Sequence, residues 1–307
     1  MSENRTFRFL PVAEFAGMRL DQYIPTQAAE LSRTMVRRII ELGGVHVGGR
    51  RIRRASHPIQ AGEQVEIFLD GASLDPWRLE STDVLYRDRF LLAINKPSGI
   101  ETQPTPARYR GTLYEALQVF LRDPFRPQQQ PEIGMAQRLD RETSGVILFS
   151  IHPRAHRGLT EAMGGRGAKK TYLALTQGQP PAAGEIRSLL ARGRADNRMK
   201  SVACGGKEAI TRYRLLEGFD EASLLEVQIL TGRTHQIRVH MAEAGHPILG
   251  DRRYGGPKVL RSSAIPRLML HAWQLQLRHP VTGEDLRLEA PPAAAFSSCL
   301  EALRAGK

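Results

Sequence analysis

The stretch RLDRETSGVILFS (138–150) decides the fold and the chemistry expected of this chain. Its second half, GVILFS, is a short apolar run typical of a buried strand. The residues before it are polar, and Asp140 with the Thr-Ser-Gly triplet that follows favours a tight turn in which side-chain oxygens accept local backbone N–H groups. A carboxylate there lies at the mouth of a sheet, where Arg138 and Arg141 would keep it ionised. A purely structural turn is the alternative.

The chain from residue 83 to 307 predicts an α+β domain around this stretch. Further strand-like runs are VLYRD (84–88), FLLAINKP (90–97), KTYLALTQG (170–178), AITRYRLLEGF (209–219), SLLEVQIL (223–230) and RLMLHAWQLQLRH (267–279). Helical patterns are fewer, near residues 113–121, 155–163 and 234–244. Long strands in irregular alternation with few helices indicate a mixed, mostly antiparallel sheet. Residues 71–82, which mix Gly, Pro and polar groups, are expected to be a linker.

A smaller module is expected at residues 17–70, after an extension of residues 1–16. Ser32 is a good helix N-cap, and Gly43 is a typical C-terminal stop. The apolar face of this helix carries Met35, Ile39 and Leu42. The residues VHV, a Gly-Gly turn and RRIRR (50–54) then predict a β-hairpin whose exit strand is rich in arginine.

Arginines dominate this module between residues 33 and 54, where Glu41 is the one acidic residue. They are Arg33, Arg37, Arg38, Arg50, Arg51, Arg53 and Arg54. A helix and a hairpin that offer guanidinium groups together suit the phosphates of a bent RNA backbone, although a solvated charged face is the alternative. The segments RLDQYIP (19–25), LSRTMVRRII (31–40) and AGEQVEI (61–67), with the hairpin, resemble the αL RNA-binding motif of a small-subunit ribosomal protein.

The composition agrees with a polyanionic partner. The formal net charge of the 307 residues is +12, and basic side chains gain free energy by releasing counterions from phosphates. The two cysteines form no CxxC pair, which favours a reducing cytoplasm over a disulfide framework or a structural zinc site. We find no signal peptide and no apolar stretch long enough to span a bilayer. A monomer without a membrane partner is the default expectation.

A second constellation is TGRTHQIRVHMAEAGHPILGD (231–251), which predicts the end of a strand and the start of a helix. Arg233 lies at this junction, where side chains and helix N–H groups point into a crevice. The core face of the helix is predicted to carry Ile237, Met241 and Ala244. A metal site is the competing interpretation, using His235, His240 and His246. Residues five apart diverge by roughly 140° on a helix, so we predict no metal site.

A third candidate is Tyr172, near the start of the strand predicted at KKTYLALTQG (169–178). It is either a half-buried core residue or a stacking platform for a nucleobase, with a phenol able to exchange a proton. The glycine-rich stretches GGRGAKK (164–170) and GGKEA (205–209) lack the spacing of a phosphate-binding loop. We therefore expect no nucleotide cofactor.

Together these segments resemble the signature motifs of the large RluA-type family of pseudouridine synthases, which modify ribosomal and transfer RNA. The motifs are INKPSG (94–99), RLDRETSGVILF (138–149), KTYLAL (170–175), GRTHQIRVHMAEAGHPILGD (232–251) and LHAWQLQLRHPVTGE (270–284). Their order and spacing match the family over residues 90–285. An αL module commonly precedes this catalytic domain.

The resemblance implies a role for each matched residue. Asp140 matches the catalytic aspartate, and Tyr172 the tyrosine that stacks on the flipped base. Arg233 matches the arginine that pairs with the aspartate. Arg138 matches the arginine that fills the gap left by the flipped uridine, and we expect Lys96 to contact RNA with it and with the αL arginines. No cofactor is implied, and Asp140 is either a nucleophile or a base.

The resemblance leaves the substrate open. The family usually has a His-Pro pair after the NKPSG segment, whereas this chain has Gln103 at the histidine position. An αL module favours large-subunit ribosomal RNA, and transfer RNA is the alternative. A non-catalytic ribosome-assembly factor is the alternative from another class, but it would be expected to have lost Asp140, Tyr172 or Arg233. A metal-dependent hydrolase lacks a ligand set.

Overall fold

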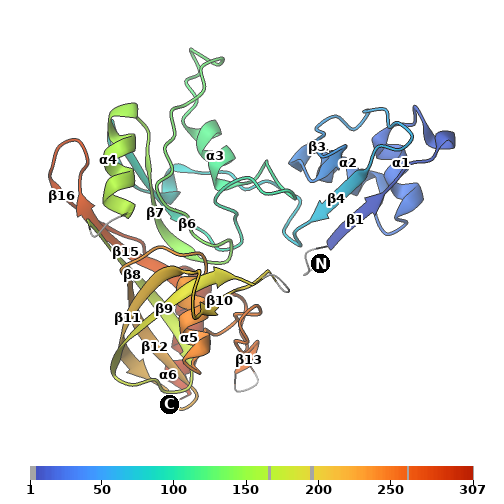
Figure 1. Cartoon of the computed structure of the whole chain (residues 1–307). Helices are drawn as coiled ribbons and strands as arrows, with labels where there is room; N and C mark the ends of the chain where they lie inside the picture. The colour runs from blue at the N-terminus through green and yellow to red at the C-terminus, as the bar shows by residue number, and fades with distance from the viewer. Residues whose placement is uncertain (1–4, 165–166, 194–196, 261–262, 307) are drawn as a thin grey trace. The chain divides into compact units, whose positions relative to one another are not determined.

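The computed structural model describes residues 5–164, 167–193, 197–260 and 263–306. Contacts divide the chain into two compact units, the first comprising Met1–Leu79 with Ile100–Gln129 and the second Glu80–Gly99 with Gln130–Lys307. The first unit thus includes residues 100–129, which the sequence had assigned to the larger domain. Each unit is described by itself below (Figure 1).

The first unit contains an antiparallel four-stranded sheet and several helical segments. Its strands, in the order β1-β4-β2-β3, are β1 (Arg5–Phe9), β4 (Val65–Leu69), β2 (Val45–Val47) and β3 (Arg50–Arg51). Its helices are α1 (Leu20–Gln27), α2 (Arg33–Leu42), α3 (Leu113–Phe120) and a short 3-10 helix at Ala13–Phe15. The predicted N-terminal extension therefore supplies an edge strand, β1. The predicted exit strand is shorter than expected, because it ends at Arg51.

Helix α2 begins and ends where the sequence predicts. The Ser32 hydroxyl accepts the Met35 N–H at 3.3 Å, and Gly43 adopts φ 90°, a left-handed conformation that glycine reaches without a steric penalty. Its buried face carries Val36, Ile39, Ile40 and Leu42, whereas the predicted core residue Met35 is only partly buried.

The second unit is built on a mixed sheet, as the α+β prediction requires. In its described part ten strands pair in the order β10-β9-β11-β12-β8-β15-β7-β6-β5, and β16 pairs with β15. The strands are β5 (Val84–Arg87), β6 (Leu91–Lys96), β7 (Ser144–Ser150), β8 (Ala168–Gln177), β9 (Ala183–Arg192), β10 (Met199–Val202), β11 (Lys207–Gly218), β12 (Ala222–Ile229), β15 (Leu270–Arg278) and β16 (Asp285–Glu289). The β7–β15 pair is parallel, and the other pairs are antiparallel.

The remaining elements of this unit lie beside the sheet. They are α4 (Pro153–Gly164), α5 (Gln236–Glu243), α6 (Ala294–Ala305), a 3-10 helix at Ser81–Asp83 and the two-stranded pair β13 (Val259–Leu260) and β14 (Ser263–Ala264). Helix α5 packs against β10 and β11 (Figure 1). Its predicted core residues Ile237 and Met241 are buried, but Ala244 is exposed. No described helix is long and apolar enough to cross a bilayer.

The strand that leaves the Asp140 turn, β7, is an interior strand of this sheet, between β15 and β6. Every residue of β7 is buried, which explains its uninterrupted apolar sequence. Gly145 pairs with Ala272 where β7 meets β15, and a Cβ at Gly145 would lie 2.1 Å from the Ala272 carbonyl oxygen. Its neighbour Ser144 contacts Nδ1 of the buried His271 at 2.9 Å. The close approach of two backbones therefore requires glycine and anchors the turn.

Candidate active site and RNA-binding surface

The catalytic loop predicted around Asp140 is a turn immediately before β7. It is closed by the Thr143 N–H, which donates to the Asp140 carbonyl at 3.1 Å. The expected contacts of the Asp140 carboxylate with local N–H groups are absent among the described residues, and its contacts are instead with distant side chains. The Asp140 carboxylate is therefore oriented by other elements of the second unit rather than by its own turn.

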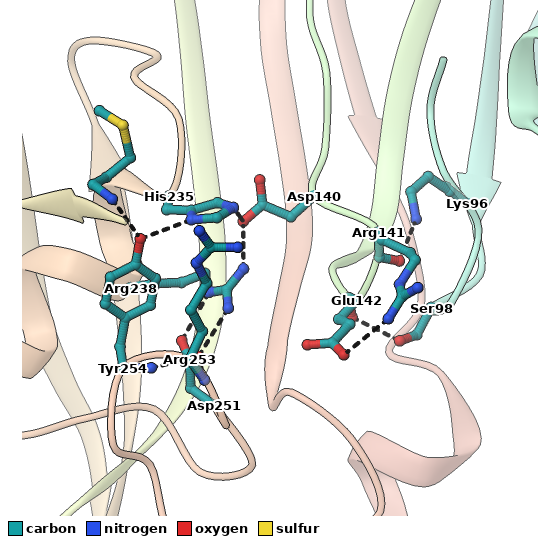
Figure 2. Close-up of polar contacts among 11 residues, drawn as sticks. Lys96, Ser98, Asp140, Arg141, Glu142, His235, Arg238, Asp251, Arg253 and Tyr254 are labelled. Carbon is teal, nitrogen blue, oxygen red and sulfur yellow. Dashed lines mark hydrogen bonds and ion pairs between the residues drawn. The ribbon is translucent and has the colours of Figure 1, made fainter. Parts of the chain in front are cut away.

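The segment NKPSG, which ends β6, supports this loop from the other side. Nζ of Lys96 donates to the Pro97 carbonyl at 2.9 Å. It also donates to the Arg141 carbonyl at 3.0 Å, and the Ser98 hydroxyl donates to the Glu142 carbonyl at 2.7 Å (Figure 2). The Gly99 N–H donates to the same Arg141 carbonyl at 2.8 Å. Lys96 is 0% exposed. The prediction that Lys96 contacts RNA is therefore wrong, because its ammonium is buried and bonded to backbone carbonyls.

The arginine that bonds the carboxylate is Arg238 of α5. Its Nη1 donates to Oδ2 of Asp140 at 3.1 Å, and its Nε and Nη2 donate to the two oxygens of Asp251 at 2.8 Å each (Figure 2). Asp251 is fully buried and also accepts the N–H groups of Arg253 and Tyr254 at 3.1 and 3.2 Å. The buried Asp251 carboxylate thus orients the Arg238 guanidinium toward Asp140.

The predicted pairing of Arg233 with Asp140 is wrong in this structure. Arg233 precedes the first residue of α5, and its exposed guanidinium donates through Nε to the Glu208 carbonyl at 2.9 Å. Gln236 holds the turn that connects Thr231 to α5, because its Oε1 accepts both the Arg233 N–H and the Thr231 hydroxyl, at 3.1 and 2.8 Å. Likewise Arg238, rather than the flanking Arg138 and Arg141, is the guanidinium bonded to the carboxylate.

The predicted residues nevertheless share one cavity of about 80 Å³ within the second unit. Its polar lining includes Arg138, Asp140, Tyr172, Arg233, His235 and Arg238. Its apolar lining includes Leu139, Ile229, Ile237 and Leu270. A carboxylate and an aromatic ring at the edge of an apolar cavity form a site in which a planar base can be held next to a reactive oxygen.

Burial and charge set the ionisation of these groups. Burial raises the pKa of the Tyr172 phenol, and the negative charge of Asp140 raises it further, so Tyr172 is a neutral phenol near pH 7. Burial alone would lower the pKa of Arg238, but the hydrogen bonds and charges of Asp251 and Asp140 outweigh it and raise the pKa. Arg238 is therefore a fixed cation beside the carboxylate.

The three histidines of the competing metal hypothesis have separate partners. Nδ1 of His235 lies 2.8 Å from the Tyr254 hydroxyl, and the ring of His240 contacts the hydroxyls of Thr211 and Ser188. Nδ1 of His246 lies 3.1 Å from the Gln177 carbonyl. Among the described residues no three His, Cys, Asp or Glu side chains cluster as metal ligands would.

The αL arginines are partly engaged within the first unit. Arg19, Arg33 and Arg37 all donate to Asp21, at 2.9, 3.1 and 2.7 Å. Asp21 is 0% exposed, and although burial opposes its ionisation, the three arginines lower its pKa well below the usual range. Arg33 and Arg37 lie on one face of α2, as predicted, and their shared ion pair with Asp21 orders both guanidinium groups. Both side chains remain 48% exposed.

The hairpin arginines lie beside the segment that follows NKPSG. The guanidinium carbons of Arg51 and Arg53 are 5.9 and 4.2 Å from the centre of the Tyr109 ring. Arg38 donates to Asp75 at 3.1 Å, and Arg54 is exposed. The departure at Gln103 thus lies in a segment that packs with the αL module, and Gln103 itself is exposed.

Comparisons with known proteins place this geometry in a family. A family model described as RNA pseudouridylate synthase matches residues 90–243, and the S4 domain model matches residues 18–65. An "Uncharacterized RNA pseudouridine synthase" from Chloroflexus aurantiacus is 38% identical over 93% of this chain and 90% of that protein. "Ribosomal large subunit pseudouridine synthase C" from Yersinia pestis is 34% identical over 95% and 94%.

Two further relatives extend the comparison. "Ribosomal large subunit pseudouridine synthase D" from Vibrio parahaemolyticus is 31% identical over 94% of this chain and 91% of that protein. The solved structure of "Human RNA Pseudouridylate Synthase Domain Containing 4" covers 73% of this chain and 94% of its own, with a TM-score of 0.61 and 26% identity. The chain therefore belongs to the RNA pseudouridine synthase family, with an S4 RNA-binding domain before the catalytic domain.

Proposed function

We propose that this pseudouridine synthase modifies uridines of large-subunit ribosomal RNA and that Asp140 is its essential catalytic residue. The substrate proposal is supported by the relatives from Vibrio parahaemolyticus and Yersinia pestis, which are named for the ribosomal large subunit, and by the S4 domain. Transfer RNA is the alternative substrate. A monomer in the cytoplasm is part of the same proposal, and the two free cysteines fit a reducing compartment.

The isomerisation changes the connectivity of the uridine but not its elemental composition. The bond between uracil N1 and ribose breaks, the base rotates, and a bond forms from C5 to the ribose while C5 loses its hydrogen and N1 gains one. The target base must first leave its helix, at a cost of about a few kcal/mol. Phosphate contacts from the αL arginines offset that cost, and Arg138, exposed at the rim of the cavity, fills the space that the base leaves.

Three groups then act on the flipped nucleotide. Asp140 attacks the ribose as a nucleophile or removes a proton from it as a base. Arg238 orients this carboxylate before the substrate arrives, and such preorganisation lowers an activation barrier. Tyr172 stacks on the uracil and retains it after cleavage, and its neutral phenol can donate a proton. The observation on which this rests is the single cavity shared by Asp140, Tyr172 and Arg238.

The test is Asp140→Asn, which keeps the size of the side chain and removes its charge. We expect unchanged RNA affinity and no pseudouridine formation, measured by gel-shift titration and by mapping of pseudouridine in the bound RNA. Residual turnover by the purified variant would contradict the role of Asp140. Mapping pseudouridines in ribosomal and transfer RNA from cells that lack the protein separates the two substrates.

A further inference from the structure

The protein treats the two oxygens of the Asp140 carboxylate differently. Oδ2 accepts the hydrogen bond from Arg238 at 3.1 Å, and Nε2 of His235 lies 3.8 Å from the same oxygen (Figure 2). Among the described residues Oδ1 has no hydrogen-bond or ion-pair partner. Since Asp140 lines the cavity and its side chain is 24% exposed, Oδ1 is the oxygen left for a ligand.

His235 has an unusual backbone at the start of α5. Its φ of 55° and ψ of 20° are left-handed, and among the described residues Asn197 is the one other non-glycine residue with positive φ. It occupies the N-cap position, yet its side chain makes no capping hydrogen bond. Its ring instead lies between Tyr254 and Asp140 (Figure 2). A left-handed backbone is unfavourable for most residues other than glycine, and such strained residues cluster at functional sites. The strain at His235 therefore suggests that the position of its ring matters for function.

The groups that face the two ring nitrogens favour one neutral tautomer. Nε2 lies 3.8 Å from the Asp140 carboxylate, beyond hydrogen-bond distance, but a carboxylate can only accept, so its negative charge favours a proton on Nε2. Nδ1 must then accept, and its partner is the Tyr254 hydroxyl at 2.8 Å. That hydroxyl oxygen also accepts the Met199 N–H at 3.2 Å, and its own proton can be donated to Nδ1. Both ends of the ring are therefore compatible with the Nε2–H tautomer.

We propose that His235 is a positioning residue for Asp140, held by Tyr254 as the Nε2–H tautomer, so that His235 and Arg238 together restrain Oδ2 and present Oδ1 to the substrate. The proposal rests on the catalytic role proposed for Asp140. The Asp251 loop connects the two restraints, because Asp251 bonds Arg238 and also accepts the Tyr254 N–H at 3.2 Å.

The charge on the ring supports this role. Burial lowers the pKa of His235 to about 4, and the charges of Arg238 and Arg253 lower it too, while Asp140 and Asp251 act in the opposite direction. The ring is therefore neutral near pH 7. A neutral N–H orients the carboxylate without adding a second cation, which would make Oδ1 less reactive.

Nitrogen-15 NMR of the histidine rings in the full-length protein at pH 7 tests the tautomer directly. His271 is the internal reference, because its Nε2 faces the Ala290 carbonyl at 3.0 Å, which also can only accept. We expect His235 and His271 to show the same neutral Nε2–H pattern, and Tyr254→Phe to mix the two tautomers of His235 alone. An imidazolium or an Nδ1–H ring at His235 would overturn the proposal. This measurement is independent of whether Asp140 is catalytic.

Kinetics of three variants test the consequence. Tyr254→Phe should lower kcat about tenfold, the usual effect of losing one hydrogen bond near a charge, with KM for RNA unchanged. His235→Gln, whose amide N–H can take the place of Nε2–H, should retain more activity than His235→Gly.

The glycine variant separates positioning from folding. Glycine adopts positive φ freely, which offsets part of the stability lost with the Tyr254 contact, so His235→Gly should remain folded and yet be slower in kcat. A glycine variant with the parent kcat, or one slower only because it unfolds, would contradict the proposal. Full activity of Asp140→Asn would instead refute the proposed function and leave the tautomer result standing.

Discussion

Replacing Arg238 by lysine, with Arg233→Lys as the matched control, tests which arginine serves Asp140. Both arginines line the same cavity and carry the same charge. Arg238 makes three charge-assisted hydrogen bonds, two to Asp251 at 2.8 Å and one to Asp140 at 3.1 Å. Arg233 donates to a backbone carbonyl, that of Glu208, at 2.9 Å.

The expected loss follows from the shape of the two cations. A lysine ammonium is a compact point charge, whereas a guanidinium is a planar fork that can bond two carboxylates at once. Lysine at 238 therefore loses at least one hydrogen bond to a charged partner, which is worth about 1.5–3 kcal/mol. If that bond is the one to Asp140, the rate falls by about 10- to 150-fold. Arg233→Lys should change the rate by no more than about twofold, as exposed substitutions usually do.

Lysine is preferable to an apolar replacement at position 238. Arg238→Met would leave Asp251, which is 0% exposed, without its cation. Breaking a buried ion pair in this way costs about 3–5 kcal/mol of folding free energy, so a loss of activity could not be separated from unfolding.

The assay is a single turnover on RNA carrying tritium at C5 of uridine, because the new bond at C5 displaces that hydrogen. Saturating enzyme removes differences in RNA affinity, and thermal unfolding of each variant controls for stability. An equal loss in the two variants, or a larger loss in Arg233→Lys, would refute the assignment of Arg238 as the partner of Asp140.

Three other predictions follow from the contacts described above. Lys96→Met should lower kcat while leaving the Kd for RNA unchanged, because Lys96 is buried and bonds the carbonyl of Arg141. Weaker RNA binding at full kcat would instead support the original prediction that Lys96 contacts RNA. Arg53→Gln should weaken RNA binding and reduce the slope of log K against log salt concentration by about 1. Arg37→Gln should have the same effect and should also destabilise the first unit, because Arg37 neutralises the buried Asp21. Equal thermal stabilities of the two variants would contradict this difference. Burial lowers the pKa of His271 to about 4, so the unfolded protein, with a histidine pKa near 6.5, binds the extra proton. Its contribution of up to about 3 kcal/mol is therefore present above pH 6.5 and is lost as the pH falls toward 4, and urea titrations should show a shallower decline in His271→Gln.

The sequence alone determined many of the local elements and the family to which the chain belongs. Ser32 and Gly43 fixed the ends of α2 because capping is a property of neighbouring residues. The run GVILFS predicted β7 because a strand buried on both faces must be apolar throughout. The sequence did not predict β9 or α6, where these signals are weak. Strand β9 is only partly buried, and the N-cap residue of α6, Ala293, has a methyl group that cannot accept a hydrogen bond.

The tertiary structure decided which of the predicted groups meet. Asp140 and Arg238 are 98 residues apart, and no periodicity distinguishes Arg238 from Arg233 as the partner. The sequence predicted that Lys96 of NKPSG contacts RNA, whereas its ammonium is buried and donates to two backbone carbonyls. Which groups meet depends on how strands and loops pack across the sheet, and that packing minimises the free energy of the whole chain rather than that of any one segment.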